Sequence, residues 1–449
     1  MHSLRHRHPA SVYLLMRGAS QLFFALMVTI NLVYQLEVAH LDPLGLLLVG
    51  SVLELTCLVL QVPTGLLADT YSRKAAIVVG TVLVGAGFTL EGLLPNFWAI
   101  LVAQVVWGAG ASLADGADDA WITDEVGPER AARLFLRSSQ IVQVSGLVGI
   151  VAAVALATIR LNLPIVAGGL ATLLLGVGLL FLIREETFVP APRLGRGRLA
   201  AVGAKAAETL GEIRSKPVLL RILAITAVAG ASSEGFDRLW QVHLLKDLGL
   251  PHFGSLNPLY WFALVSAGSV VLGLGIAELV GRYLDLGRHR VAARALFIST
   301  ALLGAAVMGF ALAPSFPIAV VSYWVARAAS RAWDPVQRAW LNQSLEPSTR
   351  ATLFSVDGQA NALGQVVSGP LLGLIARASI PTALAAAGLL LLPALALCRR
   401  ESRRPPISRR SPPGAGRRGP GRALSSPAVP AACEAAAGPA ADPPSGPGG

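Results

Sequence analysis

Charged side chains are scarce in this sequence: only 14% of its 449 residues are Asp, Glu, Lys or Arg, whereas 54% are hydrophobic. Soluble domains carry about a quarter charged residues, so the composition favours an integral membrane protein. Cysteine is scarce as well. Cys57, Cys398 and Cys433 form no CxxC pair, so we expect neither a disulfide framework nor a cysteine metal site.

Several catalytic motifs are also missing. The sequence has no G-x-x-x-x-G-K-[ST] phosphate loop, so we do not expect ATP hydrolysis to drive any process. It has no HExxH or GxSxG motif, and its seven histidines lack metal-ligand spacing. We therefore expect no enzyme activity, no metal and no cofactor.

Long apolar runs are present instead. Twelve of them reach the roughly 20 residues that a helix needs to cross the hydrocarbon core of a bilayer. They are continuous and lack the ten-residue alternation of barrel strands, so the predicted fold is an all-α integral membrane protein. The predicted spans are 11–35, 44–64, 75–94, 97–120, 134–158, 163–183, 218–245, 258–280, 291–312, 316–342, 353–376 and 380–398.

The net charge of +11 would suggest a nucleic-acid partner in a soluble protein, but its distribution gives another explanation. Most Arg and Lys residues lie in loops on one side of the spans, and the opposite loops hold little beyond Arg160, Lys246 and Arg377. The positive-inside rule places both termini in the cytoplasm. We expect a multi-pass protein of the cell (inner) membrane that contacts the lipid bilayer, binds no nucleic acid and is a monomer.

The chain divides into two related halves. A polar loop at 185–217 separates six spans from six, and a shift of 219 residues aligns Asp115 with Asp334 and Trp121 with Trp340. This pattern predicts pseudo-symmetric six-helix bundles at 11–184 and 218–398, with a substrate site between them. Residues 399–449 are rich in Pro, Gly, Ala and Ser, and we expect a disordered cytoplasmic tail.

The loop after the second span carries a motif. It reads "GLLADTYSRK" at 65–74 and resembles the signature loop of the major facilitator superfamily, with Gly65, Asp69, Arg73 and Lys74 matching. A weaker copy, "GRYLDLGRHR", stands at 281–290. The resemblance implies the major facilitator fold and a loop that locks the cytoplasmic ends of the halves together in the outward-open state. Alternatively, Arg73 and Lys74 only satisfy the positive-inside rule.

The stretch at 110–140 resembles the antibiotic and multidrug efflux branch of that superfamily, which includes macrolide and tetracycline exporters. The usual helix-4 arginine is absent, since "QVVWGAG" has Gln104 at that place, and the helix-5 Gly-Pro motif is absent too. The resemblance implies proton-coupled efflux of antibiotics or other amphipathic drugs by alternating access. The alternative is uptake or export of a sugar or another small metabolite.

A charged stripe interrupts the tenth span. Arg327, Arg331, Asp334 and Arg338 follow one another at steps of four, three and four, which places them on one helix face. The 219-residue shift maps this stripe onto a face of the fourth span that is rich in aspartate. We predict an inner gate between the two faces; the alternative is pairing within the tenth span, Arg331 with Asp334 and Asp334 with Arg338. The predicted gate residues are Asp115, Asp118, Asp119, Arg331, Asp334 and Arg338.

Two acidic residues are candidates for proton coupling. Glu234 lies in the middle of the seventh span and is the first candidate; Asp115 is the second. A carboxyl group in a poorly solvated cavity can exchange protons near neutral pH. We interpret Glu54 and Glu278 as interfacial or helix-packing groups, and expect Arg327 to attract an anionic or carbonyl group of the substrate or to neutralise Asp115.

Aromatic side chains complete the predicted cavity. They offer faces to a bulky amphipathic ligand, although each aromatic residue can instead belong to the lipid belt or the packing. We predict that the cavity is largely apolar, with few amides. The predicted cavity residues are Phe24, Tyr34, Trp107, Trp240, Trp324 and Arg327.

Overall fold

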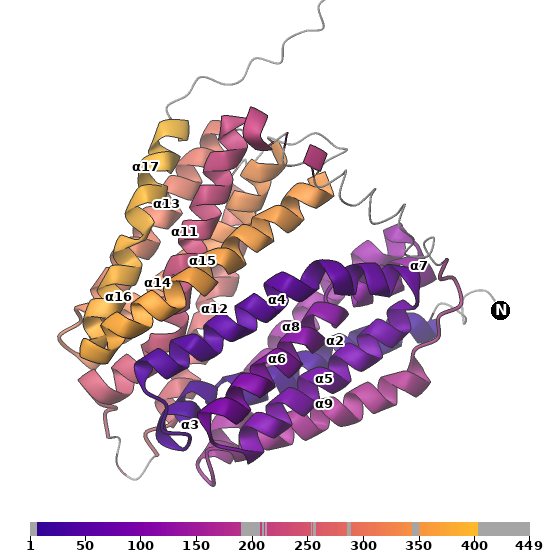
Figure 1. Ribbon diagram of the computed structural model, residues 1–449, viewed down its shortest axis with the longest axis horizontal. Helices are drawn as coiled ribbons and strands as arrows, with labels where there is room; N and C mark the ends of the chain where they lie inside the picture. Colours follow the sequence, from indigo (N-terminus) through magenta and orange to yellow (C-terminus); the bar gives the residue numbers. More distant parts are fainter. Residues whose placement is uncertain are drawn as a thin grey trace, which may run out of the picture. The chain divides into compact units, whose positions relative to one another are not determined.

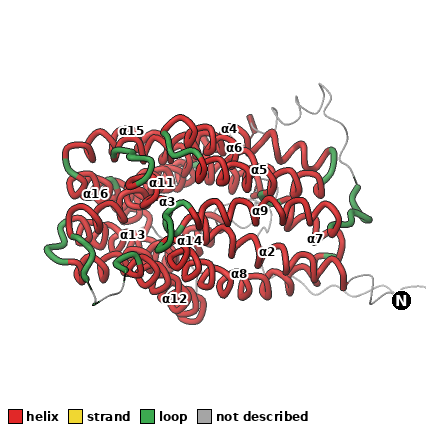
Figure 2. Tube along the Cα trace, turned by 90° about the horizontal axis from the view of Figure 1, so that it is seen from below, coloured by secondary structure: helices red, strands yellow, loops and turns green. Residues whose placement is uncertain are grey.

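A computed structural model shows that the described part of the chain is built from helices, most of which are joined by short loops (Figures 1 and 2). The structure describes residues 7–189, 207–208, 211, 213–252, 254, 257–284, 289–343 and 350–402. No β-strand occurs in these ranges. Each of the twelve predicted spans coincides with a helix or with two consecutive helices, which confirms the all-α fold.

In the first half, the first and fourth spans are each broken into two helices. Span 1 is broken between Val28 and Asn31, and span 4 is broken at Asp115 and Gly116. Gly116 has a left-handed backbone (φ +74°), which a glycine adopts without strain. The helices are α2 (Arg7–Val28), α3 (Asn31–Glu37), α4 (Pro43–Thr70), α5 (Arg73–Leu93), α6 (Phe97–Ala114), α7 (Ala117–Val126), α8 (Pro128–Ala157) and α9 (Leu163–Leu182).

In the second half, the seventh span ends in a π-helical turn and the twelfth span is divided in two. α17 continues to Ser402, so the first four residues of the predicted tail are helical; residues 403–449 lie outside the described part. The elements are α11 (Pro217–His243), η1 (Leu244–Leu248), α12 (Tyr260–Tyr283), α13 (His289–Ala311), α14 (Phe316–Gln343), α15 (Arg350–Ala378), α16 (Ile380–Leu389) and α17 (Leu391–Ser402).

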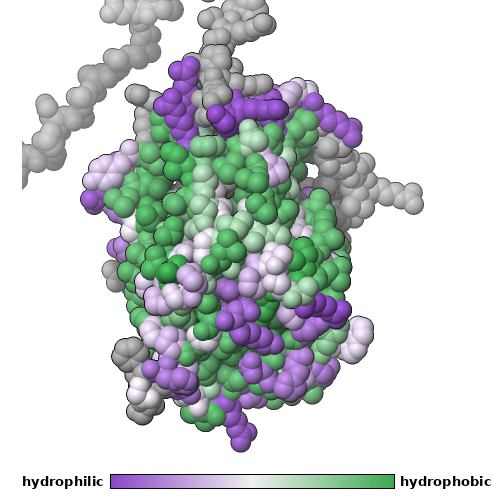
Figure 3. Space-filling view, turned by 90° about the vertical axis from the view of Figure 1, so that its left-hand side faces the viewer, coloured by the Kyte–Doolittle hydropathy of each residue, from purple (hydrophilic) through white to green (hydrophobic). Residues whose placement is uncertain are grey.

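Ten helical stretches of the described chain are long and apolar enough to cross a membrane. α14 and α15 are as long but more polar, because they carry the charged stripe and several amides. Hydrophobic side chains cover the middle of the face in Figure 3, and hydrophilic ones gather toward its two ends. Large apolar residues such as Leu174, Phe181 and Leu136 are more than 70% exposed, as expected for a surface that lipid covers.

Local signals explain where the helices begin. The side chains of Asp42, Ser72 and Asn96 cap α4, α5 and α6, each accepting a hydrogen bond from a backbone N–H three residues later. α8, α9 and α11 begin with a proline in the first turn, where its missing N–H leaves no hydrogen bond unmade. These caps fix the residue at which each helix begins and thereby limit the length of the loops between spans, including the loop after α4.

Most helix contacts stay within one half of the chain. α5 packs on α6 and α9, and α2 packs on α8, whereas α11 packs on α15 and α13 on α14. Between the halves, α4 packs on α15 and α11, and α8 packs on α12. Gly369 and Gly373 of α15 permit the close approach to α4, because a Cβ at either position would clash with an α4 side chain.

Candidate functional site

A cavity of about 890 Å³ lies between the two halves and is lined by residues of both. Four of the predicted cavity residues lie on its wall: Phe24, Trp107, Trp240 and Arg327. In the first half, the Trp107 ring packs on Phe88, with ring centroids 5.0 Å apart. In the second half, the Trp240 ring packs on Tyr323 at 4.5 Å. The cavity therefore has one aromatic patch on each side.

Two predicted cavity residues are placed elsewhere. Tyr34 is fully buried inside the first half, where its hydroxyl donates to the backbone oxygen of Glu91 (2.7 Å). Trp324 packs between α12 and α14, and its indole N–H donates to the Val265 oxygen (2.9 Å). A buried phenol or indole requires a hydrogen-bond acceptor, and both residues find it away from the cavity wall, which corrects their assignment.

Amide side chains are more numerous on the cavity wall than we expected. Six elements each contribute one, so the prediction of a largely apolar cavity with few amides is wrong. The amides are spread thinly along the chain and meet only because their helices surround the same space. They are Gln21, Asn31, Gln104, Gln143, Gln241 and Gln365.

The first proton-coupling candidate is buried at the contact between the halves. Glu234 is only 2% exposed, lines the cavity, and lies 3.3 Å from the Nε of Arg238, one turn along α11. Gly50 of α4 makes room for this pair, because a Cβ there would overlap the Glu234 carboxylate oxygen. If either group of such a buried pair loses its charge, the charge of the other group is left without its partner.

Arg327 has a protein partner, and this partner is not Asp115. Its guanidinium lies 2.5 Å from the carboxylate of Asp237 on α11 and stacks over the rings of Phe236 and Tyr323, about 5 Å from each centroid. No acidic residue lies one turn away from Arg327 on α14, and the partner comes from a different helix. The charge of Arg327 is therefore balanced within the second half.

The aspartates of the predicted gate have partners within their own half. Asp118 forms an ion pair with Arg17 of α2 (2.8 Å), and Asp119 accepts a hydrogen bond from the Tyr13 hydroxyl (2.7 Å). Both contacts join α7 to α2. Asp115 is exposed and stands at the break between α6 and α7.

The arginines of the predicted gate do not reach these aspartates in this conformation. Arg331 and Asp334 line the large cavity, and Arg338 is exposed. Within the described ranges, no ion pair shorter than 4.0 Å joins Arg331 or Arg338 to Asp115, Asp118, Asp119 or Asp334. The gate is not formed here and stays a prediction for another conformation. Within α14, Arg331 and Arg338 act on Asp334 through their charges at longer range.

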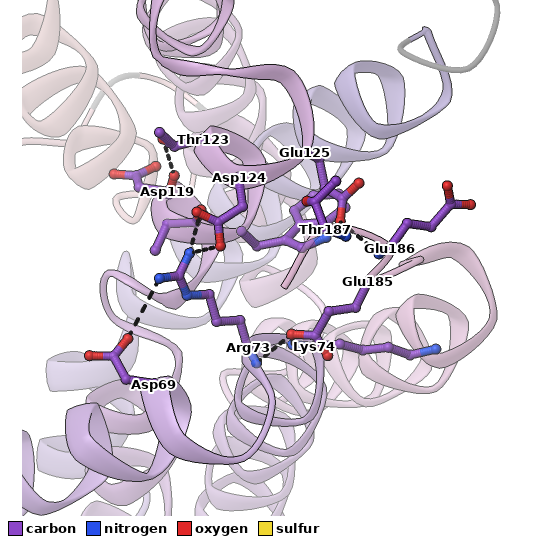
Figure 4. A network of polar contacts seen from close by, with 12 residues as sticks. Asp69, Arg73, Lys74, Asp119, Thr123, Asp124, Glu125, Glu185, Glu186 and Thr187 are labelled. Atoms are coloured by element: carbon purple, nitrogen blue, oxygen red, sulfur yellow. Dashed lines mark hydrogen bonds and ion pairs between the residues drawn. The ribbon is translucent and has the colours of Figure 1, made fainter. Parts of the chain in front are cut away.

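The loop after α4 is the centre of a polar network (Figure 4). Arg73 forms ion pairs with Asp69, at 3.7 Å, and with Asp124 of α7. It also donates to the backbone oxygen of Ala120 (2.8 Å). One arginine thus ties the end of α4 to α7, so the loop links the second and fourth spans.

The same network reaches the segment that follows α9. Glu185 accepts hydrogen bonds from the Ser72 hydroxyl (2.6 Å) and the Arg73 backbone N–H (2.7 Å), as Figure 4 shows for the latter. The Lys74 side chain points away from this cluster. A Cβ at Gly65 would meet no atom within 4 Å, so crowding does not explain that glycine.

At the opposite end, α4 and α15 are joined by an ion pair. The Nε of Arg377 lies 2.5 Å from Asp42, which also caps α4. Partial burial alone would raise the pKa of Asp42, but hydrogen bonds from Gly45 and Arg377 together with the arginine charge lower it. The contact therefore holds at neutral pH and weakens only as the pH falls through that lowered pKa.

One buried carboxylate was missed by the sequence analysis. Glu91 of α5 is 0% exposed and accepts hydrogen bonds from the amides of Gln35 (2.6 Å) and Gln104 (3.0 Å). The signal was present, because an ionisable residue inside a predicted span is rare and is usually functional. Glu91 lies three residues before the end of the predicted third span, where a charged residue of the membrane interface is ordinary.

Comparisons with known proteins agree with this architecture. Residues 10–297 match the sequence profile of the Major Facilitator Superfamily. The chain belongs to this superfamily. It is 24% identical to the uncharacterized MFS-type transporter YxaM of Bacillus subtilis (strain 168) over 345 residues, which cover 75% of this chain and 82% of YxaM.

Solved major facilitator structures share the fold. A point mutant of the nucleoside transporter NupG superposes with a TM-score of 0.69 at 13% identity, covering 88% of this chain and 98% of NupG. The peptide transporter POT in complex with sulfate gives 0.64 at 16% identity, covering 88% and 95%. Within the described residues no cluster of metal ligands occurs. Because the chain belongs to the Major Facilitator Superfamily and has helices that can cross a membrane, the protein is a multi-pass membrane transporter of a small molecule.

Proposed function

We propose that this transporter exports amphipathic organic molecules in exchange for protons, with Glu234 as the coupling group. The observation that carries the proposal is the buried Glu234–Arg238 pair, which lies on the cavity wall and against Gly50 of the other half. A change in the charge of Glu234 affects both the cavity and the contact between the halves. An antiporter must couple these two, because solute binding in the cavity has to change with the movement of the halves.

The coupling step follows from the chemistry of the pair. A proton from cavity water that binds Glu234 makes the carboxyl group neutral, and Arg238 then loses the charge that holds it. Arg238 becomes available to a solute, or moves and loosens the α4–α11 contact at Gly50. Release of the proton restores the pair. Binding of a solute and binding of a proton thus oppose each other through one side chain.

The walls of the cavity suit a solute with flat apolar and hydrogen-bonding parts. Aromatic rings on both sides supply stacking surfaces, and the six amides supply donors and acceptors. The direction of transport rests on the resemblance of residues 110–140 to drug exporters. We therefore propose antibiotics or similar amphipathic compounds as the exported class.

The amides also favour a second candidate, a polar metabolite that makes many hydrogen bonds. NupG is a nucleoside transporter and POT is a peptide transporter, and both share the fold. Uptake or export of a nucleoside, a sugar or a small peptide is the second candidate for this reason. It would use the same cavity, with the amides in place of the aromatic patches as the main contacts.

Drug susceptibility separates the two candidates. The protein is expressed in an efflux-deficient strain, and growth is measured against macrolides, tetracyclines, phenicols and cationic dyes, with an empty vector and the Glu234→Gln variant as controls. The proposal predicts severalfold higher tolerance for at least one class, lost in the variant. Equal tolerance in all three strains, with wild type and variant present at matched protein level, would exclude drug export and leave the metabolite.

A further inference from the structure

Glu91 stands apart from the coupling pair described above. It lies in α5, inside the first half, and its side chain has no contact with solvent. Neither α6 nor α9, the two helices packed most closely on α5, carries an ionisable residue. The titratable group that contacts it from α3 is Tyr34, and the charge of Arg238 in the second half also acts on it. No ion pair within 4.0 Å reaches Glu91 from the described residues.

An unpaired carboxylate at this place is costly. Removing such a charge from water carries a penalty of several kcal/mol, which hydrogen bonds from neutral amides offset only in part. The penalty disappears when the carboxyl group takes up a proton. The surroundings of Glu91 therefore favour a group that exchanges a proton over one that holds its charge permanently.

The hydrogen bonds around Glu91 can serve both states. In the structure the carboxylate accepts N–H groups from the side-chain amides of Gln35, Gln104 and Asn31, so it acts only as an acceptor. The amide oxygen of Gln35 is buried and has no hydrogen-bond partner, and neither has that of Asn31. A protonated carboxyl group needs an acceptor, and a half-turn of the Gln35 amide supplies one.

Glu91 is connected to the cavity wall by a short chain of contacts. Gln104 donates to Glu91, and its amide oxygen accepts from the indole N–H of Trp107 (2.9 Å). Both Gln104 and Trp107 line the large cavity. The carboxylate fixes which end of the Gln104 amide faces Trp107, so its charge sets the orientation of two residues of the cavity wall.

We propose that Glu91 is a second proton-binding site, in the first half of the transporter, and that it positions Gln104 and Trp107 for the transported solute. The proton comes from water in the cavity and converts the carboxylate into a neutral carboxyl group. The hydrogen bond from Gln104 then loses its charge assistance and weakens. Trp107 becomes free to turn toward the solute. This role deepens the proposed transport function, but proton binding itself needs no transport to be observed.

The test is a pH titration of Trp107 fluorescence in the purified full-length protein. The protein contains eight tryptophans, so the Trp107 signal is taken as the difference between each protein and its own Trp107→Phe variant. We expect one proton-dependent transition in the wild type. The transition should be lost in Glu91→Gln, and in Glu91→Asp it should be kept with a shifted midpoint.

Two further variants make the result specific. Glu234→Gln should keep the Trp107 transition even though it abolishes coupling, so the two proposals fail independently. Glu125→Gln is the matched control, because Glu125 is also buried but lies in α7 and accepts from the backbone N–H groups of Glu186 and Thr187. It too should keep the transition.

Three results would overturn the proposal. They are a wild-type signal that does not change with pH, a transition that survives in Glu91→Gln, and a transition removed by Glu234→Gln. If Glu91→Gln does not fold, the midpoint of Glu91→Asp decides alone: an unchanged midpoint excludes Glu91 as the titrating group.

Discussion

At the scale of single residues, Gly50 tests the coupling pair without removing either charge. A Cβ at this position would overlap the Glu234 carboxylate and lie 2.5 Å from the Nε of Arg238, so Gly50→Ala must push the pair aside. Overpacking of this kind costs about 1–3 kcal/mol. We expect severalfold slower transport, measured as initial rates in reconstituted vesicles.

The matched control for Gly50→Ala is Gly178→Ala, in α9. No atom lies within 4 Å of the added Cβ at that position. Alanine should therefore leave transport unchanged and stabilise α9 by up to about 1 kcal/mol. Equal losses in both variants would show that transport does not tolerate alanine at helical glycines in general, and would contradict the role assigned to Gly50.

The side chains that matter at this scale were only partly predictable. Glu234 and Arg327 stand out in the sequence because a charged residue within an apolar run is conspicuous. Asp237 was not recognised as the partner of Arg327, since the two residues meet only when α11 packs on α14. The six cavity amides were missed for the same reason: one glutamine in a helix shows no pattern until six helices surround one space.

At the scale of elements, Arg73 joins α4 to α7 through two carboxylates and a backbone oxygen. Because a charged hydrogen bond contributes about 1.5–3 kcal/mol and an exposed ion pair less than about 1 kcal/mol, Arg73→Ala should destabilise this arrangement by a few kcal/mol at most. We expect a lower midpoint of thermal unfolding and slower transport, with Asp124→Ala giving a similar result.

Lys74→Ala is the control for this loop, because it removes a positive charge from the next position while leaving the network intact. Its side chain points away from Asp69 and Asp124 in Figure 4. The variant should behave as wild type in both measurements. If Lys74→Ala is as defective as Arg73→Ala, the loop acts through its net charge, as the positive-inside alternative holds, and the specific pairing has no role.

The elements themselves were easier to predict than their breaks. Runs of about twenty apolar residues predict twelve spans, each of which coincides with helix, and ten of these helical stretches are long and apolar enough to cross a membrane. Asp42, Ser72 and Asn96 mark helix starts at positions where the sequence has an ordinary capping residue. The interruption at Asp115 and Gly116 was not predicted. The sequence shows only a glycine after an aspartate inside an apolar run. This pattern does not reveal that the helix breaks there, because the break depends on the packing of α7 on α2.

At the scale of the whole molecule, the predicted inner gate describes a conformation other than this one. Arg331 lies on the cavity wall with no ion-pair partner in the described chain, and Asp119 is held by Tyr13. If the gate closes in the other state, Arg331 should couple to Asp119 in transport rates but not in the thermal stability of the resting protein. A coupling of about 1.4 kcal/mol changes the ratio of two conformers tenfold.

A double-mutant cycle measures this coupling. The variants are Arg331→Ala, Asp119→Ala and their combination, compared with a parallel cycle in which Asp334→Ala replaces Asp119→Ala. The gate predicts a non-additive effect on turnover in the first cycle. Non-additivity in the second cycle alone would favour pairing within α14 and would contradict the predicted inner gate.

Proton coupling through Glu234 is the central claim, and transport by the Glu234→Gln variant in proteoliposomes tests it most directly. Solute movement is measured twice, once driven by an imposed pH gradient and once as exchange at equal pH. Glu54→Gln, which changes another carboxyl group of the same cavity, is the control. We predict that Glu234→Gln loses gradient-driven transport while keeping exchange, and that the control keeps both. Gradient-driven transport that persists in Glu234→Gln would contradict the account.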